Sequence, residues 1–201
     1  MRCWRTSCEQ RARPSLIQTI KQKLLTLRAS RILQSGKLIA HAASTVPGVA
    51  ASPCHPQSVR LLQRFKQRQG PFICIADSMR TAVRHTRYLP HVLRRAMRQF
   101  WPGNTTLVVP GRPGLPRACY ARGKIALRVD GDATSRRLAR LSNGLILSTS
   151  LNRRKQPLQS LNPRIRMRWH RYVSGVMTAE KRPNEPSSIL LWKHGHFHRL
   201  R

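Results

Sequence analysis

The sequence contains very few acidic residues. Its 201 residues include 6 Asp and Glu against 39 Lys and Arg, which gives a formal net charge of +33 and a sequence pI near 12.0. The acids are Glu9, Asp77, Asp130, Asp132, Glu180 and Glu185. The chain therefore has almost no carboxylates from which to form the active site of a two-carboxylate glycosidase, a two-metal nuclease or an aspartic protease. Catalysis by positioning and by cationic charge stabilisation remains feasible, and adenylyl or phosphoryl transfer uses both.

Paired cysteines and long apolar runs are also missing. The five cysteines are odd in number and lack C-x-x-C spacing, which predicts free thiols in a reducing compartment and a cytoplasmic protein. They are Cys3, Cys8, Cys54, Cys74 and Cys119. No segment approaches the roughly 18 apolar residues of a membrane span, so we predict a soluble protein with no membrane partner. His194, His196 and His198 alternate along an expected final strand, and they favour an exposed basic edge over a metal site because no carboxylate or cysteine lies nearby.

The positive charge predicts a polyanionic partner. A net charge of +33 attracts phosphates, and nucleic acid is the usual partner of so basic a protein. Basic residues are spread over the whole chain, which leaves open that part of the charge serves solubility. The first thirty residues are rich in Arg and carry a single acid, Glu9, but the rest of the chain is equally basic, so a targeting role for this segment also stays open.

Hydrophobic spacing predicts one α/β domain over residues 15–201, after an irregular basic extension over residues 1–14. An amphipathic helix is predicted from Ser15 to Gly36, and its apolar residues are Leu16, Ile17, Ile20, Leu24, Leu27 and Leu33. Further helices are predicted over residues 56–67, in one or two pieces over 81–100 with a break at Pro90, and over 134–141. Predicted strands cover residues 37–40, 72–76, 107–109, 125–129 and 145–148. The acidic pair Asp130 and Asp132 falls in a predicted loop, because Gly131 between them favours a turn.

Two short polar motifs about eighty residues apart indicate a nucleotide site. Lys66 and Arg68 stand two apart, so on an extended segment both side chains would point to one side and clamp a polyphosphate. Ser150 and Asn152 repeat this spacing with neutral groups, at the end of a strand that begins at Gly144. Each motif alone is weak, since a Lys-x-Arg pair in so basic a chain is most often a solvated pair of charges. The order of the motifs along the chain carries more information.

A Phe-Trp-Pro-Gly segment at residues 100–103 and an apolar strand that contains Arg128 lie between the two motifs. In this order the motifs resemble those of the YrdC/TsaC family, the threonylcarbamoyl-AMP synthases, over roughly residues 31–201. Residues 36–53 are similar to the opening strand and loop of that family, and residues 186–199 to its final strands. The resemblance implies a twisted, open, mixed sheet with flanking helices and a basic concave face.

The resemblance also implies an activity and roles for individual residues. The activity is condensation of L-threonine, bicarbonate and ATP into threonylcarbamoyl-adenylate, which feeds the threonylcarbamoyl modification of adenosine in tRNA. Mg²⁺ is expected to accompany ATP, bound mainly by its phosphates. Lys66 and Arg68 would hold the triphosphate, and Ser150 and Asn152 would bind the nucleotide. Arg128 would take the threonine carboxylate with support from Thr149. No protein-bound metal is expected, and tRNA and other proteins of the threonylcarbamoyl-transfer pathway are the expected partners.

A second hypothesis is a binding module for double-stranded RNA or ribosomes that keeps the fold without the synthase chemistry. The family reads Tyr-Pro-Thr-Glu in its opening loop, whereas residues 41–44 read His-Ala-Ala-Ser here, and this change favours the module. The retained Lys-x-Arg and Ser-x-Asn motifs favour the enzyme. The basic loop 153–157 suits either a solvated surface or a phosphate contact, and the basic and aromatic stretch 164–172 suits either RNA backbone contacts or an amphipathic core element.

Overall fold

A computed structural model describes residues 16–158, 160–162, 164–177 and 185–201 of the chain. Its helices are α1 (Leu16–Gln34), α2 (Pro56–Lys66), α3 (Met79–Arg84), α4 (His91–Phe100), α5 (Ala133–Leu141) and α6 (Arg164–Arg168), with a single 3-10 turn η1 (Arg117–Cys119). Its strands are β1 (Leu38–His41), β2 (Gly48–Ala51), β3 (Ile73–Ala76), β4 (Thr105–Pro110), β5 (Tyr120–Ala121), β6 (Lys124–Val129), β7 (Leu145–Ser150), β8 (Val173–Met177), β9 (Ser188–Lys193) and β10 (His196–Arg199). The extension predicted over residues 1–14 lies outside the described residues.

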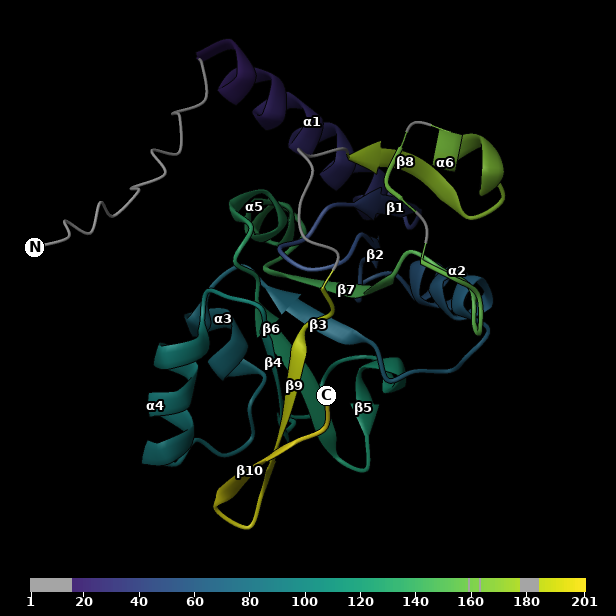
Figure 1. Ribbon diagram of the computed structural model, residues 1–201. Coiled ribbons are helices and arrows are strands. Elements are labelled where there is room, and N and C mark those ends of the chain that lie inside the picture. The colour runs from purple at the N-terminus through teal and green to yellow at the C-terminus, as the bar shows by residue number, and fades with distance from the viewer. Residues whose placement is uncertain (1–15, 159, 163, 178–184) are drawn as a thin grey trace, which may run out of the picture.

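All ten strands belong to one open sheet with helices on both faces (Figure 1). The strand order is β10-β9-β4-β6-β3-β7-β2-β1-β8, and β5 pairs with β6 beside this path. The β1–β8, β3–β6 and β4–β9 pairs are parallel, and the other pairs are antiparallel. This arrangement confirms the expected α/β class and the mixed sheet. Sequence spacing missed β2, β5 and β8.

Alternation along the strands gives the sheet two different faces. On one face, residues such as Cys74, Leu127 and Leu147 are fully buried under α2, α3 and α4 in the main hydrophobic core. On the other face, Ile75 and Ile146 form a smaller core with residues of α1 and α5. Helices α1 and α5 cover only part of this face of the sheet. The rest of that face stays accessible, and the candidate site lies there.

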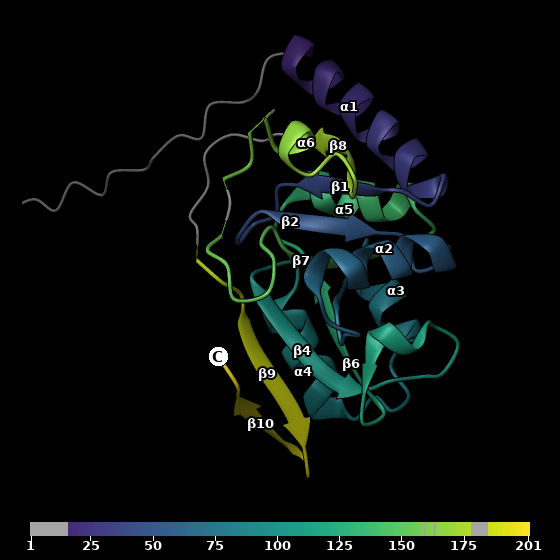
Figure 2. The same ribbon diagram turned by 90° about the vertical axis from the view of Figure 1, so that its right-hand side faces the viewer.

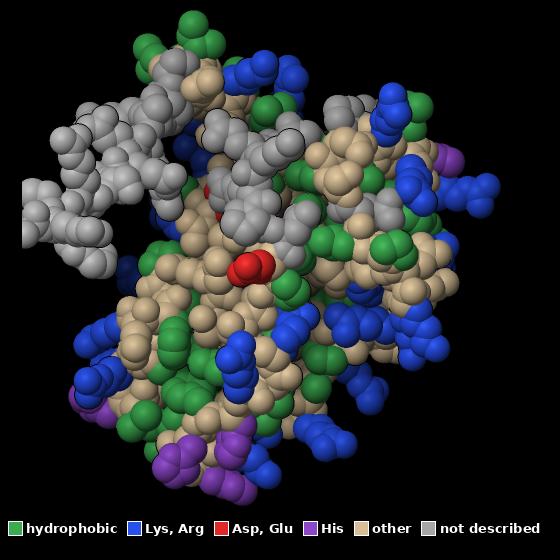
Figure 3. Space-filling view, viewed as in Figure 1, with side chains coloured by type: hydrophobic (Ala, Val, Ile, Leu, Met, Phe, Trp, Pro, Cys, Tyr) green, Lys and Arg blue, Asp and Glu red, His purple; other side chains and the backbone are tan. Residues whose placement is uncertain are grey.

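Helix α1 packs on the body in a way that its sequence pattern does not predict. Of the six apolar residues expected to define its amphipathic face, Leu33 alone is buried, whereas Leu16, Ile17, Ile20, Leu24 and Leu27 are 38–77% exposed. The small residues Thr26, Ala29 and Ser30 face the body instead. Helix α1 runs along β8 and β1 (Figure 2), and Gly175 of β8 makes room for its Ile32 side chain. Hydrophobic atoms are consequently uncovered at the end of the molecule where α1 lies (Figure 3).

The Trp-Pro-Gly segment and the histidines near the end of the sequence also have defined places in the fold. The Trp-Pro-Gly segment links α4 to β4 as a turn anchored by Trp101, which is buried and whose indole Nε1 donates to the Thr105 carbonyl at 2.8 Å. Three histidines gather at the β9–β10 hairpin (Figure 3), where His196 and His198 are exposed on β10. His194 lies in the connecting turn, so the expectation that all three alternate along one strand is wrong for this residue. Within the described residues, no cluster of three or more His, Cys, Asp or Glu has a geometry suited to a metal ion. No described helix is long and apolar enough to cross a bilayer.

Candidate functional site

A large basic cavity occupies the open part of the second sheet face. Its volume is about 930 Å³. Half-buried apolar residues on neighbouring strands, Ile73, Val108 and Ala126, line it beside polar groups. Eight of its lining residues are cationic: Lys66, Arg68, Lys124, Arg128, Arg153, Arg154, Lys155 and Arg201. No described lining residue carries a side-chain carboxylate. Such a cavity suits a ligand with several negative charges.

All six residues predicted for the site line this cavity: Lys66, Arg68, Arg128, Thr149, Ser150 and Asn152. The expected extended geometry of the Lys-x-Arg motif is wrong. Lys66 is the last residue of α2, and Gln67 adopts a left-handed conformation with φ 54° and ψ 41°. The amides of Gln67 and Arg68 donate back to the carbonyls of Arg64 and Gln63, which closes the helix end. The carboxyl end of a helix also favours cations, so this setting suits both side chains.

Lys66 binds the Ser-x-Asn motif directly. Its ammonium donates to the Ser150 hydroxyl at 2.9 Å, the Ser150 carbonyl at 3.2 Å and the Asn152 carbonyl at 2.8 Å, and also contacts Asn152 Oδ1. The Ser150 hydroxyl donates to Asn152 Oδ1 at 2.7 Å. The two motifs that are about eighty residues apart in sequence therefore form one hydrogen-bonded cluster. Burial, and to a smaller extent the nearby charge of Arg68, together lower the pKa of Lys66 from 10.5 to about 8.

Arg128 is held at another part of the cavity by a buried ion pair. Its guanidinium lies 2.7 Å from the Asp130 carboxylate and donates to Thr45 Oγ1 at 3.0 Å, while its Nε has no hydrogen-bond partner. Burial lowers the pKa of Arg128, and Asp130 opposes this shift. Asp130 also accepts from the backbone amides of Ser44 at 2.9 Å and Asp132 at 2.8 Å. The same carboxylate thus fixes both Arg128 and the opening loop.

The opening loop carries a buried neutral histidine. His41 Nδ1 donates to the Ala42 carbonyl at 2.8 Å, so its Nε2 accepts from the Ser148 hydroxyl at 3.0 Å. Complete burial lowers the pKa of His41, which favours this neutral form. Gly48 is adjacent, and a Cβ there would come within 3.0 Å of His41 Nε2, the Ser148 hydroxyl and the Thr149 carbonyl. Glycine is therefore required for the close approach of β2 to β7.

Sequence reasoning missed several residues of this site. Thr45, Ser148 and Arg201 line the cavity, and Asp130 orients Arg128. A signal for Asp130 was present, because Arg128 and Asp130 stand two apart after an apolar strand, a spacing that places both side chains on one face. The acidic pair does lie in the predicted loop, where Asp132 caps α5 by accepting from the amides of Thr134 and Ser135.

The basic loop after Asn152 meets the aromatic stretch that the sequence left open. The Arg153 guanidinium lies 5.9 Å from the ring centre of Trp169 and 5.8 Å from that of Tyr172. Both rings contact the fully buried Phe65 edge to face, at 5.5 and 5.8 Å. Residues 164–172 therefore contribute to the core through Ile165, Trp169 and Tyr172, as an amphipathic core element does.

Comparisons with known proteins agree with this architecture. The Sua5/YciO/YrdC family model, described as "Telomere recombination", matches residues 31–201. The chain is 34% identical over 131 residues to a threonylcarbamoyl-AMP synthase of Methylococcus capsulatus, an alignment that covers 62% of this chain and 68% of that protein. It is 30% identical over 165 residues to a threonylcarbamoyl-AMP synthase of Stenotrophomonas maltophilia, covering 79% and 88%.

A solved structure gives the same result for the fold. The crystal structure of P. abyssi Sua5 complexed with L-threonine superposes with a TM-score of 0.79 at 21% identity. The match covers 88% of this chain and 53% of that one, so the chain spans about half of the Sua5 length. With a family match over residues 31–201 and two relatives at 30% identity or more, the chain belongs to the Sua5/YciO/YrdC family.

Proposed function

We propose that this protein makes threonylcarbamoyl-AMP from L-threonine, bicarbonate and ATP, for the threonylcarbamoyl modification of tRNA. The observation that carries the proposal is the single cavity that brings together Lys66, Arg68, Arg128, Ser150 and Asn152 with no described carboxylate side chain in its lining. Relatives named threonylcarbamoyl-AMP synthase support the same activity. The reaction assigned to the protein is a nucleotidyl transfer.

Lys66 and Arg68 take the triphosphate in this proposal. Arg68 is exposed just beyond the end of α2, and its guanidinium lies 5.1 Å from the Phe72 ring centre, which leaves its edge available to phosphate oxygens. Lys66 attracts the phosphates through its charge, and its hydrogen bonds to Ser150 and Asn152 fix the position of its ammonium group. Both cations offset the charge that develops on departing pyrophosphate.

Arg128 takes the threonine carboxylate. Its Nε is a buried donor without a partner, and a carboxylate provides the acceptor that this group lacks. Thr45 is bonded to the same guanidinium at 3.0 Å, and Thr149 lines the cavity, so both are placed to support the amino acid. The L-threonine complex of P. abyssi Sua5 shows that a protein of this fold binds threonine.

The chemistry needs no protein nucleophile. The threonine amine attacks the bicarbonate carbon, and loss of water leaves a carbamate. A carbamate oxygen then attacks the α-phosphorus of ATP, and the bond to the bridging oxygen breaks as pyrophosphate leaves with its electron pair. Because the described cavity lining offers no carboxylate side chain, Mg²⁺ enters on the phosphates of ATP rather than in a protein cage.

The proposal extends to the setting of the enzyme. We assign it to the cytoplasm, with tRNA and proteins of the threonylcarbamoyl-transfer pathway as partners, because the adenylate product must be passed to a tRNA acceptor. The net charge of +33 also supports the alternative of an RNA-binding module. The Lys66–Ser150–Asn152 cluster favours the enzyme, because a diffuse electrostatic surface needs no such arrangement.

The test is pyrophosphate release by the purified protein in the presence of Mg²⁺ and ATP. We expect release that requires both L-threonine and bicarbonate. The variant Lys66→Ala should abolish release while RNA affinity changes little, since one charge among 39 contributes little to a diffuse footprint. Absence of release, combined with tight RNA binding that weakens with salt, would overturn the proposal in favour of the binding module.

A further inference from the structure

The hydrogen-bond inventory of the Lys66–Ser150–Asn152 cluster leaves few groups free for a ligand. The Lys66 ammonium has three N–H groups and already faces four oxygens of Ser150 and Asn152. The single proton of the Ser150 hydroxyl goes to Asn152, and Asn152 Nδ2 donates to the Gln156 carbonyl at 2.6 Å. A triphosphate needs several more donors than this cluster has available.

Arg153, the residue directly after Asn152, has a hydrogen-bond donor that is not used within the protein. It lines the cavity, and its Nε is buried with no hydrogen-bond partner. A buried cationic donor without an acceptor is unfavourable, so this position of Arg153 favours binding of an anion. Among the cavity cations, Arg128 is the other one with such a buried unpaired Nε, and it is neutralised by Asp130.

The surroundings of Arg153 hold its guanidinium in place. Its planar group lies against the Trp169 and Tyr172 rings, which pack on Phe65 in the main core. Stacking uses the face of a guanidinium and leaves the N–H groups at its edge free to donate. Part of the rotamer entropy of a long side chain is thus already lost before a ligand arrives.

The backbone that carries Arg153 is also fixed. The Gln156 amide donates to the Arg153 carbonyl at 3.1 Å, and the Leu151 amide donates to the Pro47 carbonyl at 2.8 Å in the opening loop. Together with the Asn152–Gln156 bond, these contacts tie the loop to the end of β7. The Lys66 ammonium also donates to the carbonyls of Ser150 and Asn152, the residues on either side of Leu151.

We propose that Arg153, held on the Trp169–Tyr172 platform, is a polyphosphate-binding residue of the cavity. Its ligand is the triphosphate chain of the nucleotide substrate, and of the pyrophosphate product, rather than the nucleoside or the amino acid. In this arrangement the guanidinium edge of Arg153 donates to the phosphates and Lys66 attracts them through its nearby charge, while Ser150 and Asn152 hold Lys66 and the loop in position. The inference rests on the proposed function for the identity of the nucleotide, but it concerns phosphate binding alone.

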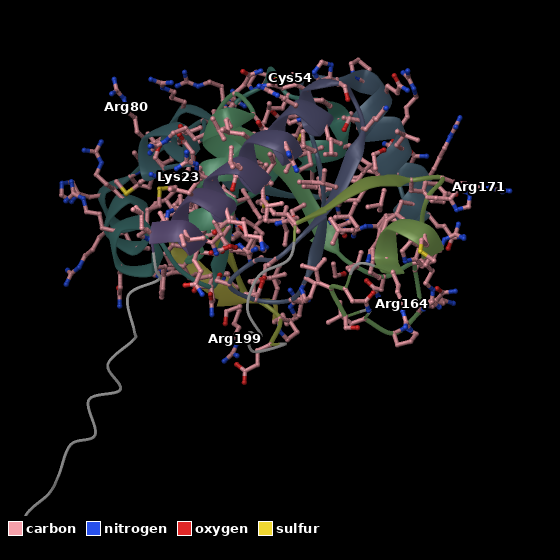
Figure 4. All side chains as sticks on the ribbon, turned by 90° about the horizontal axis from the view of Figure 1, so that it is seen from above. Lys23, Cys54, Arg80, Arg164, Arg171 and Arg199 are labelled. Carbon is pink, nitrogen blue, oxygen red and sulfur yellow. The ribbon has the colours of Figure 1, made fainter. Side chains whose placement is uncertain are left out.

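The test compares Arg153→Met with Arg171→Met by titration calorimetry. Methionine keeps an unbranched stem against the rings and removes the charge, whereas Arg171 is an exposed arginine that points away from the body after α6 (Figure 4). The probes are inorganic tripolyphosphate, ATP and AMP at one fixed salt concentration. We expect Arg153→Met to weaken tripolyphosphate and ATP by about tenfold or more, with AMP changed less than about threefold. Arg171→Met should change all three by less than about twofold.

A spectroscopic readout tests the platform itself. Tripolyphosphate should change the tryptophan fluorescence of the protein, and Trp169→Phe should remove most of that change while binding persists. Unfolding temperatures of all variants establish that each is folded.

Several results would overturn the inference. They are tripolyphosphate affinity unchanged in Arg153→Met, an equal loss for AMP and tripolyphosphate, an equal loss in Arg171→Met, or no tripolyphosphate binding by the unmodified protein. The proposed function fails separately. If pyrophosphate release does not depend on threonine while Arg153→Met still loses tripolyphosphate selectively, the phosphate site stands without the synthase activity.

Discussion

The depressed pKa of Lys66 makes phosphate binding depend on pH in a defined direction. Burial, followed by the charge of Arg68, lowers this pKa from 10.5 to about 8. A bound triphosphate stabilises the charged ammonium and returns the pKa toward its ordinary value, so binding takes up a proton wherever free Lys66 is neutral. With a pKa of about 8, about nine tenths of free Lys66 is charged at pH 7 and about nine tenths is neutral at pH 9. Linkage then predicts that tripolyphosphate affinity falls about tenfold between pH 7 and pH 9, or about 1.4 kcal/mol.

The assay is calorimetric titration with tripolyphosphate at constant ionic strength from pH 7 to pH 9.5. Repeating each titration in two buffers of different ionisation enthalpy gives the number of protons taken up, which should rise from near zero to near one. The control is Lys66→Arg, because a guanidinium stays charged over this range and should remove the dependence. A flat affinity profile for the unmodified protein, or the same slope in Lys66→Arg, would refute the reasoning.

Three further predictions concern the stability of the fold, measured by urea denaturation. Asp130→Asn removes one partner of the buried ion pair with Arg128 and should lower the free energy of unfolding by about 3 kcal/mol. Asp77 lies 3.7 Å from an exposed arginine, so Asp77→Asn should lower it by less than about 1 kcal/mol. Equal losses in the two variants would contradict the importance of the buried pair. Gln67→Gly relieves the left-handed backbone at the end of α2 and should stabilise the protein by about 1 kcal/mol, and a loss would be evidence against that conformation. Leu33→Ala should cost at least about 2 kcal/mol and Leu24→Ala less than about 0.5 kcal/mol, and the reverse order would mean that α1 packs through its other face.

Strand positions could be predicted from sequence where local pattern and burial agree. The runs over residues 125–129 and 145–148 are apolar, bounded by turn residues, and lie in the centre of the sheet. Strand β8 carries Ser174 and Gly175 in its interior, so its strand character depends on parallel pairing with β1, which lies far away in the sequence. In strand β2, Val49 is the one residue that favours a strand, and the Gly and Ala residues around it give no such signal.

The site was also predicted in part: its residues were identified from the sequence, but their geometry was not. Through the family resemblance, the order of Lys66, Arg128, Ser150 and Asn152 along the chain predicted that they share a site, and all four line one cavity. Their geometry was not predictable, because Gln67 closes α2 in a left-handed turn where an extended segment was expected. The exposure of the apolar residues of α1 could not be predicted either, since amphipathic spacing does not indicate which face a tertiary contact covers. The contribution of Arg153 depends on aromatic residues that follow it by 16 and 19 positions and required the structure.

The most direct test of the central claim is the product itself. The purified protein is incubated with ATP, Mg²⁺, L-threonine and isotopically labelled bicarbonate, and the mixture is separated by chromatography and analysed by mass spectrometry. We predict a labelled threonylcarbamoyl-adenylate that requires all three substrates and disappears in Lys66→Ala. Tight ATP binding without any labelled adenylate, at protein concentrations where pyrophosphate release would be detected, would contradict the account.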